Sequence, residues 1–352
     1  MTGPELEQYL AASRAETLEE LQRWLPQDRR HTGGLYELML DYPLRPAKAL
    51  RPALAIATCR ALGGSLDRVL PTAAVLELYH NAFLVHDDVE DGSELRRQAP
   101  TLHRLHGVPV AVNVGDGMLA LSLEPLLANT RIVGLGQALR ILACFGRMAR
   151  ESAEGQMLEL AWIRDHRWDL GDRDYVRMVW KKTAWYSFIT PLSVGAITAG
   201  AGPDTIRVLG RLGTFLGVAF QITDDLLNLV GDQAALGKER DGDLWEGKHT
   251  LILGHALRRS SAAARREAIA ILAKNRPRDA AAPGPGERTR ADVATLRDLI
   301  ERTGALPHAA QVAQRWAGGA GRILETRLGH LPPSNHLEFL RALVDYVAAR
   351  SW

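Results

Sequence analysis

The sequence predicts an all-α protein that folds as a single domain over residues 1–352. Alanine and leucine dominate its apolar residues, few stretches alternate strictly between apolar and polar side chains, and apolar residues recur at helical spacing. Hydrophobic residues make up 46% of the chain, which is ample for a core and excludes global disorder. No linker divides the chain into unlike halves.

The helices can be placed one after another along the chain. The first covers 5–25, where Leu6, Leu10 and Leu21 recur among acidic residues and arginines. Gly and Pro residues lie in several of the later breaks. The other predicted helices cover 49–62, 71–91, 114–128, 135–163, 172–200, 203–230, 248–273, 291–302, 306–327 and 336–350. The Ala-, Pro- and Gly-rich stretch 276–290 cannot hold a regular helix, so we expect a flexible surface loop there.

Charge and composition narrow the class of protein. Lys and Arg number 43 against 41 Asp and Glu, and a formal charge of +2 gives no electrostatic reason to expect a nucleic-acid partner. Cys59 and Cys144 fit neither a disulfide framework nor a zinc site, which suits a reducing compartment. The N-terminus lacks the basic and apolar regions of a signal peptide, and no run of 18 apolar residues occurs. We therefore expect a cytoplasmic protein without a membrane span.

The first acidic cluster, His86-Asp87-Asp88-Val89-Glu90-Asp91, ends a long apolar helix. Asp87 and Asp91 are four residues apart, so their carboxylates share one face of that helix. Like charges at this spacing repel each other unless a cation or another partner offsets them. Mg²⁺ binds through one or two carboxylates together with phosphate oxygens and water. The cluster therefore indicates a magnesium–phosphate site, and a solvated acidic helix end is the alternative.

The second acidic cluster lies in a strongly apolar helix. Its polar residues fall at i, i+3, i+4 and i+7 on one face, and they are Gln221, Asp224, Asp225 and Asn228. Adjacent carboxylates in apolar surroundings are costly unless they are paired. A metal ion and an anionic ligand between the two clusters would provide the pairing, and an amphipathic surface helix is the alternative.

Basic residues lie before and after both clusters. They are Lys48 and Arg51 upstream, Arg96 and Arg97 after the first cluster, Lys182 mid-chain, and Lys238 and Lys248 after the second. Two acidic clusters with these cations suit a diphosphate held by metal ions on one side and by Arg or Lys on the other. The chain has no Walker-type loop and no GxGxxG after a strand, so the sequence does not favour a nucleotide as the ligand that carries this diphosphate.

Five motifs in this order resemble those of the trans-isoprenyl diphosphate synthases, also called polyprenyl synthetases. They are Glu77 to Asp91 with Arg96-Arg97, Gly155-Gln156, Lys182-Thr183-Ala184, Gln221 to Asn228, and Gly237-Lys238 with Glu246-Gly247-Lys248. The resemblance covers nearly the whole chain from about Lys48. It implies an all-helical bundle around a deep central cavity, usually in a homodimer.

The resemblance also implies a reaction. In this family three Mg²⁺ ions bridge an allylic diphosphate to both aspartate motifs and favour ionisation of its C–O bond. The double bond of isopentenyl diphosphate attacks the allylic cation, and loss of a proton leaves a chain that is one C5 unit longer. Mg²⁺ is thus the implied cofactor, and isopentenyl diphosphate and allylic diphosphates are the implied substrates.

Residue roles follow from the matched motifs. The implied metal ligands are Asp87, Asp88, Asp91 and Asp224, and these four with Lys182 and Gln221 are the implied catalytic residues. The implied allylic site contains Arg96, Lys182, Thr183, Gln221, Asn228, Lys238 and Lys248. Isopentenyl diphosphate would be bound by Lys48, Arg51, His80 and Arg97. His80 precedes Asp87 by two helical turns on the same face, which is consistent with two adjoining pockets.

The chain departs from the family pattern at a few positions. Gly-Lys-Arg-x-Arg-Pro becomes Ala47-Lys48-Ala49-Leu50-Arg51-Pro52, Arg-Arg-Gly becomes Arg96-Arg97-Gln98, and the second motif has Asn228 in place of Asp. The Asp-Asp-x-x-Asn form resembles that of geranylgeranyl-forming members. We therefore expect geranylgeranyl diphosphate (C20), with farnesyl (C15) or C25 products as alternatives.

Two other functions fit the same fold. One is a class I terpene cyclase, but the second metal motif of the cyclases is not met after Asn228. The other is a non-catalytic partner subunit of a prenyl synthase, which would be expected to lose aspartates that this chain keeps.

The helix before Asp87 also predicts where chain growth stops. Phe83 lies one turn before Asp87 on the same face, where its ring can obstruct the growing tail, whereas Ala82 leaves space beside it. This mixed pair favours a C20 product. The alternative is that Phe83 only packs against a neighbouring helix.

Overall fold

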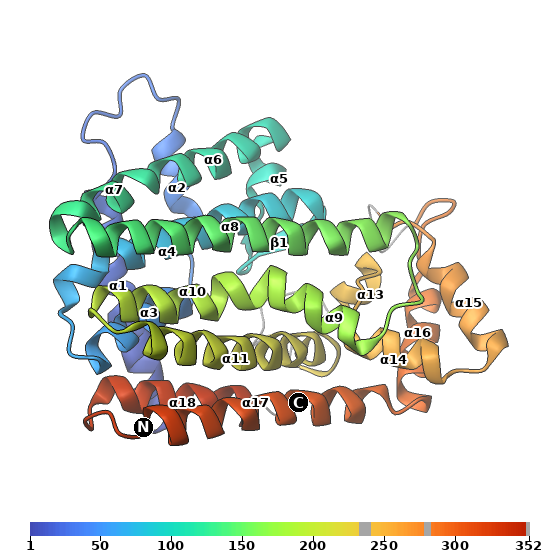
Figure 1. Cartoon of the computed structure of the whole chain (residues 1–352). Coiled ribbons are helices and arrows are strands. Elements are labelled where there is room, and N and C mark those ends of the chain that lie inside the picture. Colours follow the sequence, from blue (N-terminus) through green and yellow to red (C-terminus); the bar gives the residue numbers. More distant parts are fainter. Residues whose placement is uncertain (232–240, 278–282, 350–352) are drawn as a thin grey trace.

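The computed structural model describes residues 1–231, 241–277 and 283–349. Within these ranges the protein is almost entirely helical, as predicted, and has one antiparallel pair of short strands, β1 (Leu95–Arg96) and β2 (Ala99–Pro100). Figure 1 shows the long helices stacked in layers, with α8 above the α9–α10 segment, then α11, then α17 and α18.

Each predicted helix has a counterpart in the structure. The first half contains α1 (Gly3–Arg23), α2 (Leu35–Leu44), α3 (Leu50–Ala61), α4 (Leu66–Glu90), α5 (Leu102–His106), α6 (Val108–Leu121), α7 (Leu123–Ile132) and α8 (Leu135–Arg164). The second half contains α9 (Asp172–Val179), the π-helix η1 (Trp180–Ile189), α10 (Thr190–Thr198), α11 (Pro203–Val230), α13 (Gly242–Glu246), α14 (Leu251–Arg259), α15 (Ala262–Leu272), α16 (Arg290–Arg302), α17 (Ala305–Ile323), the π-helix η2 (Leu324–Leu328) and α18 (Asn335–Ala349). Periodicity did not predict α2, α5 and α13, and it merged α6 with α7, α9 with η1 and α10, α14 with α15, and α17 with η2.

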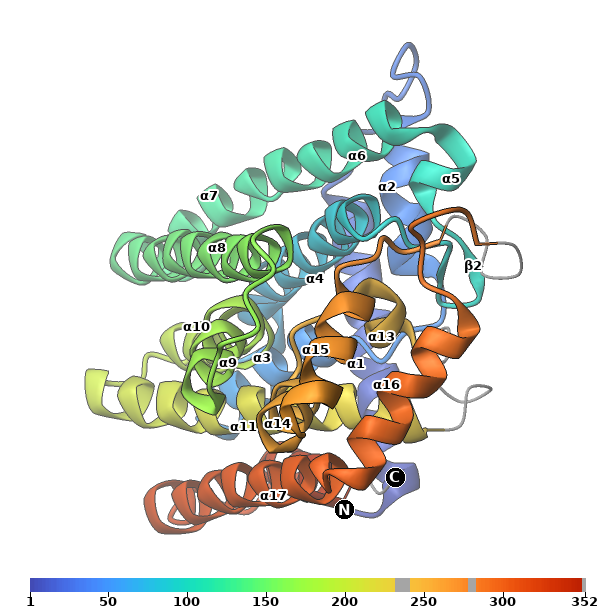
Figure 2. The same ribbon diagram turned by 90° about the vertical axis from the view of Figure 1, so that its right-hand side faces the viewer.

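Helix α4 is the central helix of the first half. Almost every residue from Val69 to Asn81 is buried, as expected for a helix that is enclosed on all sides. It packs against α1, α3, α6, α7 and α10, and Figure 2 shows it in the interior of the bundle. Asp87 lies in its last turn, and Asp91 caps its C-terminus. The burial of α4 therefore determines where the first acidic cluster lies.

Glycines let α8 and α11 approach η1 closely. A Cβ atom at Gly155 of α8 would lie 2.2 Å from the backbone nitrogen of Lys182, and one at Gly217 of α11 would lie 2.5 Å from the Cβ atom of Ala184. Larger residues would force these helices apart. The two helices therefore pack closely against the π-helix that carries Lys182 and Thr183. Such π-helical turns are frequent at functional sites.

The segment that joins α15 to α16 has one firmly anchored end. Arg288 is buried and donates hydrogen bonds to the carbonyl oxygens of Leu244 in α13 at 3.2 Å and Leu272 in α15 at 2.8 Å. The predicted loop over 276–290 ends where α16 begins, at Arg290. Its residues 278–282 lie outside the described ranges, so its flexibility stays a prediction.

Candidate active site

A cavity of about 600 Å³ lies between the end of α4, the β1–β2 hairpin and the segment around α13. Its walls carry charges of both signs. Among the lining residues, Asp87, Asp91, Asp243 and Glu246 supply carboxylates, and Arg96, Lys248 and Arg276 supply cations. Asn228 of the second acidic cluster also lines it. The fold thus places the first acidic cluster opposite residues of the second cluster and of the segment after it.

The carboxylates of the cavity are crowded. Burial raises the pKa of Asp91 to about 9, and the negative charges of Asp87 and Glu246 add to this shift. Burial together with Asp243 raises the pKa of Glu246 to about 6. Burial acts on Asp87 in the same direction, but the charges of Lys182 and other cations outweigh it and lower the pKa of Asp87. Several hard oxygen ligands in one cavity fit a divalent cation such as Mg²⁺, whose charge would offset their repulsion.

Asp88 has a different environment from its neighbour Asp87. Its buried carboxylate accepts hydrogen bonds from Nε of Arg96 at 3.0 Å and from the hydroxyl of Tyr42 at 2.6 Å. A second nitrogen of Arg96 also donates to it. These hydrogen bonds give Asp88 a role besides the expected one, and its role as a metal ligand stays a prediction. Because its oxygens are used by Arg96 and Tyr42, Asp88 positions the guanidinium of Arg96 at the cavity.

Lys182 connects the first acidic cluster to α8. Its Nζ atom lies 3.5 Å from Oδ1 of Asp87 and forms an ion pair with Glu159 of α8. Burial lowers the pKa of Lys182, but the charges of Glu159 and Asp87 outweigh burial and raise it. Lys182 is therefore a cation at neutral pH and suits a phosphate oxygen as a ligand.

A chain of hydrogen bonds joins η1, α11 and α9 beside Lys182. The hydroxyl of Thr183 donates to Oε1 of Gln221 at 2.9 Å, and Nε2 of Gln221 donates to Asp225 at 2.8 Å. The hydroxyl of Tyr175 donates to the other oxygen of Asp225 at 2.6 Å. Burial raises the pKa of Asp225 to about 7. The structure brings Thr183 and Gln221 together as expected, and it assigns Asp225 to holding Gln221 in place.

Asn228 and Lys248 lie in the wall that faces the first acidic cluster. Oδ1 of Asn228 accepts a hydrogen bond from the backbone nitrogen of Asp243 at 3.2 Å, which ties α13 to α11. Nζ of Lys248 lies 3.6 Å from Oδ1 of Asp243. Burial lowers the pKa of Lys248, but the carboxylates around it outweigh burial and raise it. Asp224 is half-buried on α11, one turn before Asn228, and Lys238 lies outside the described residues.

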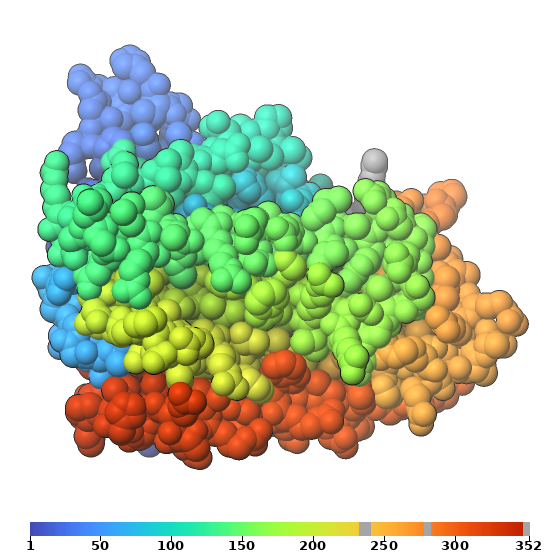
Figure 3. Space-filling view, viewed as in Figure 1, coloured from blue at the N-terminus to red at the C-terminus, as the bar shows by residue number. Residues whose placement is uncertain are grey.

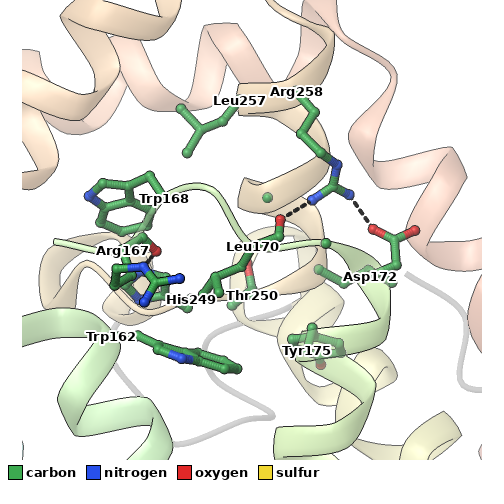
Figure 4. A pocket seen from close by; sticks show the side chains of 13 residues that line it. Trp162, Arg167, Trp168, Leu170, Asp172, Tyr175, His249, Thr250, Leu257 and Arg258 are labelled. Atoms are coloured by element: carbon green, nitrogen blue, oxygen red, sulfur yellow. Dashed lines mark hydrogen bonds and ion pairs between the residues drawn. The ribbon is translucent and has the colours of Figure 1, made fainter. Parts of the chain in front are cut away.

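A small aromatic pocket lies beside the residue that follows Lys248 (Figure 4). The ring of His249 stacks on Trp168 with centroids 3.9 Å apart, and its Nε2 lies 2.8 Å from the carbonyl oxygen of Arg167. Burial lowers the pKa of His249 to about 4, so the neutral ring donates its Nε2 proton to that carbonyl. This packing holds the backbone from which Lys248 reaches the cavity.

A second group of cations lies on α3, α4 and the hairpin. Arg51 lies over the ring of Tyr186, 4.5 Å from its centroid, and donates to Oγ of Ser187 at 2.8 Å. Burial and then the charges of Arg51 and Arg97 hold the pKa of His80 well below its usual range. Nε of Arg51 and Nδ1 of His80 are buried without a hydrogen-bond partner among the described residues. Three of the four residues expected to bind isopentenyl diphosphate therefore gather in a site that fits an anion.

Lys48, the fourth of these residues, contacts a different element. Its Nζ atom lies 2.6 Å from the hydroxyl of Tyr346 in the C-terminal helix α18. Gln98, where the family has glycine, has a φ angle of 65°, so the chain keeps a left-handed turn that favours glycine. Ala49 at the N-cap of α3 is also left-handed, with a φ angle of 46°.

The two residues predicted to limit chain length lie on different sides of α4. The ring of Phe83 is 5.9 Å from that of Tyr79 and 5.6 Å from that of Tyr186, so Phe83 lies next to the second group of cations. Ala82 is fully buried in an apolar cluster with residues of α1, α2 and α6. The expectation that Ala82 leaves space beside Phe83 is therefore corrected, because neighbouring helices fill the space around Ala82.

Sequence patterns did not assign some charged residues to this site. They are Glu159, Asp243, Glu246 and Arg276. Glu246 lies within the motif Glu246-Gly247-Lys248 and Glu159 follows Gly155-Gln156 by three residues, so both carried a signal. Arg276 carried none, because it lies in the low-complexity stretch, and only the folded chain brings Arg276 to the cavity.

Comparison with known proteins identifies the class. The family model of polyprenyl synthetases matches residues 34–282. The short chain isoprenyl diphosphate synthase of Methanothermobacter thermautotrophicus is 33% identical over 305 residues, which cover 86% of each chain. The geranylfarnesyl diphosphate synthase of Aeropyrum pernix is 32% identical over 86% of this chain and 90% of its own. This chain therefore belongs to the polyprenyl synthetase family and is a prenyltransferase of the trans-prenyl diphosphate synthase type.

A solved structure agrees with this assignment. Geranylgeranyl pyrophosphate synthase from Corynebacterium glutamicum, complexed with isoprenyl diphosphate and magnesium, superimposes with a TM-score of 0.83. The two chains are 27% identical, and the match covers 98% of this chain and 99% of that one. The predicted isoprenoid synthase fold is confirmed. The differing names of these relatives leave the product length open.

Proposed function

We propose that this prenyltransferase condenses isopentenyl diphosphate with an allylic diphosphate and releases mainly geranylgeranyl diphosphate (C20). The observation that carries the proposal is the presence of two different anion sites in one bundle. The cavity at Asp87 and Asp91 combines carboxylates with cations, whereas the group of Arg51, His80 and Arg97 presents cations to the ligand. This arrangement suits one diphosphate bound with metal ions and one bound without them.

The cavity carboxylates fit magnesium, the cofactor of this family. We propose that Asp87, Asp91 and Asp224 hold three Mg²⁺ ions, with Asp243 and Glu246 beside them. The raised pKa values of Asp91 and Glu246 support this, because they reflect first the burial of these carboxylates and then their mutual repulsion, and a divalent cation would offset both. When bound, the ions neutralise the charge of a departing diphosphate.

The side chains orient the two substrates in this mechanism. Arg96, Lys182 and Lys248 bind the oxygens of the allylic diphosphate, and the first two are held in place by Asp88 and Glu159. The second group of cations binds the diphosphate of isopentenyl diphosphate and keeps it throughout the reaction. The allylic C–O bond breaks, the isopentenyl double bond forms the new C–C bond, and a proton leaves the isopentenyl unit to restore a double bond.

The aromatic group around Phe83 supports a short product. The ring of Phe83, one turn before Asp87, contacts Tyr79 of the same helix and Tyr186 of η1, and we propose that a tail leaving the Asp87 cavity runs towards these rings. A ring at this depth would stop the tail after a few C5 units, which favours C20. Since one relative is a geranylfarnesyl diphosphate synthase, a C25 product is the competing outcome.

An exposed apolar face supports a homodimer. Large apolar residues of α7 and α8 are exposed, and they include Leu123, Leu127, Leu135, Leu139 and Met157. Figure 3 shows α8 running across the front of the molecule. Val108–Ile132 is also long and apolar enough to cross a membrane by length and composition. Because α6 packs against α2 and α4, we do not assign Val108–Ile132 to a membrane. We propose instead that the exposed apolar face of α7 and α8 packs against a second copy of the chain. Light scattering on purified protein can measure the mass of the resulting dimer.

The reaction can be tested directly. Purified protein is incubated with Mg²⁺, isopentenyl diphosphate and each allylic primer in turn, and the length of the products is measured. Elongated all-trans products with C20 predominant support the proposal. Cyclised products, or none with any primer, contradict it, and full activity in excess chelator contradicts the role of the metal.

A further inference from the structure

Arg276 enters the active-site cavity from a segment that no recognised motif covers. It follows α15 and lies two residues before the part of the chain outside the described ranges. Its neighbour Asn275 is paired with the far side of the same segment, since Asn275 accepts from the backbone nitrogen of Arg288 at 2.9 Å and donates to Gly286 at 3.1 Å. Arg288 is itself anchored to α13. The backbone that presents Arg276 is therefore tied to the cavity wall.

The side chain of Arg276 is placed where a diphosphate would lie. Its guanidinium lines the cavity that also contains Asp91 and Lys248, and Nη1 lies 2.7 Å from Oε1 of Glu246. The side chains of Arg276 and Glu246 are only 22% and 23% exposed, so the pair is partly screened from water. Arg276 thus lies inside the site and not on the outer surface.

The cations that line this cavity, Arg96, Lys248 and Arg276, are each paired with a carboxylate. Nε and Nη2 of Arg96 both donate to Oδ1 of Asp88, which is fully buried. Lys248 lies among Asp243, Asp225 and other carboxylates. Glu246 differs because it faces Asp91 across the cavity, among the carboxylates that a divalent cation would bind. When cations neutralise these carboxylates, the guanidinium of Arg276 can exchange Glu246 for a phosphate oxygen, a ligand that suits its planar fork equally well.

We propose that Arg276 is a further substrate-binding residue of this enzyme and that it binds the diphosphate of the allylic substrate in this cavity. This inference rests on the proposed function for the identity of the substrate. The predicted binding of Arg276 to a magnesium-bound diphosphate does not depend on that identity, and it can be measured without turnover.

The test compares Arg276→Gln, which removes the charge, with Arg276→Lys, which keeps the charge and loses the fork. Arg266→Gln is the matched control, because Arg266 is exposed on α15 and has no partner among the described residues. Calorimetry measures the affinity for inorganic pyrophosphate at saturating Mg²⁺, and initial rates give both KM values. We expect Arg276→Gln to weaken pyrophosphate binding and raise the allylic KM about tenfold, the loss typical of a charge-assisted hydrogen bond. Arg276→Lys should lie between, and the isopentenyl KM should stay unchanged.

A purely structural role for Arg276 makes a different prediction. Arg276→Lys keeps the ion pair with Glu246, so under that role it would keep the pyrophosphate affinity and the allylic KM of the wild type, and that result would overturn the inference. Unchanged pyrophosphate affinity and allylic KM in both Arg276 variants would overturn it as well. If Arg276→Gln does not fold, the comparison is made with Arg276→Lys and its melting temperature. Loss of pyrophosphate binding in the variants alongside a wild type that elongates no primer would refute the proposed function while supporting this inference.

Discussion

The two anion sites of this bundle balance charge in different ways. In the Asp87 cavity each cation has a carboxylate beside it, as with Arg96 and Asp88 or Arg276 and Glu246. In the second site Arg51 and Arg97 surround a buried neutral His80, and two of the buried polar atoms have no partner among the described residues. A site with both signs can hold metal ions and stabilise charge that develops as an anion departs. A cationic site holds an anion that keeps its charge, so the contrast matches the different fates of the two diphosphates.

The largest expected effect is on kcat, and it should distinguish Asp87 from its neighbour Asp88. We expect Asp87→Asn to lower kcat about a thousandfold, roughly 4 kcal/mol, because it removes a carboxylate that holds the metal. Its melting temperature should stay close to that of the wild type. Asp116→Asn, at a side chain that is 67% exposed, is the control. A kcat within about tenfold of wild type, a loss of roughly 1.4 kcal/mol, would refute the role of Asp87.

Asp88→Asn should show the opposite pattern. Removing the charge that faces Arg96 leaves a buried guanidinium without its counterion, which lowers the free energy of unfolding by roughly 3–5 kcal/mol. Thermal or urea unfolding should therefore report a large loss of stability. If the Asp88→Asn protein were as stable as the wild type but inactive, the result would show that Asp88 acts mainly as a metal ligand.

Substitutions in the second site should change the KM for isopentenyl diphosphate. Arg51→Ala is expected to raise the KM for isopentenyl diphosphate by about tenfold or more, since it removes a charge-assisted hydrogen bond, and to leave the allylic KM nearly unchanged. Lys48→Ala should have a smaller effect, because Lys48 contacts Tyr346 instead of the Arg51 group. Initial rates with each substrate varied in turn give both values. A larger effect on the allylic KM would mean that the two sites are interchanged.

The first site should also depend on pH. With a pKa of about 9, Asp91 is protonated at pH 7.5 in the metal-free protein, and Mg²⁺ must displace that proton. Apparent Mg²⁺ affinity should therefore rise as pH increases from 7 towards 9. Calorimetry in buffers of different ionisation enthalpy should show proton release on Mg²⁺ binding, and Asp91→Asn should reduce it. Equal affinity at pH 7 and 9 would show that Asp91 is already ionised.

The smallest effect on rate concerns product length. Phe83→Ala should shift products towards C25 or longer with activity retained, because the ring lies in the aromatic group beside the second site. Ala82→Phe should lower stability by about 1–3 kcal/mol through overpacking, since Ala82 is enclosed by apolar residues. Chromatography of the dephosphorylated products measures the first effect and thermal unfolding the second. An unchanged product distribution in Phe83→Ala would place the end of the tail channel elsewhere.

Periodicity predicted the long helices well and the short elements poorly. A helix such as α4 or α11 repeats its apolar spacing over many turns, so the pattern is visible in the sequence. The five-residue helix α13 has no room for a repeat, and it is held by Asn228 and Arg288 from other parts of the chain. The strands β1 and β2 have two residues each, too few to show alternation.

The sequence by itself determined which chemistry this protein carries. The order and spacing of the acidic and basic motifs indicated a metal-assisted diphosphate site, because residues four apart share one face of a helix wherever that helix lies. The tertiary structure decided which individual side chains take part. Asp87 and Asp88 differ by about 100° around α4, and only the packing of Arg96 and Tyr42 determines which of them faces the cavity. Glu159, Asp243 and Arg276 reach the site through contacts between distant segments, and no local pattern encodes such contacts.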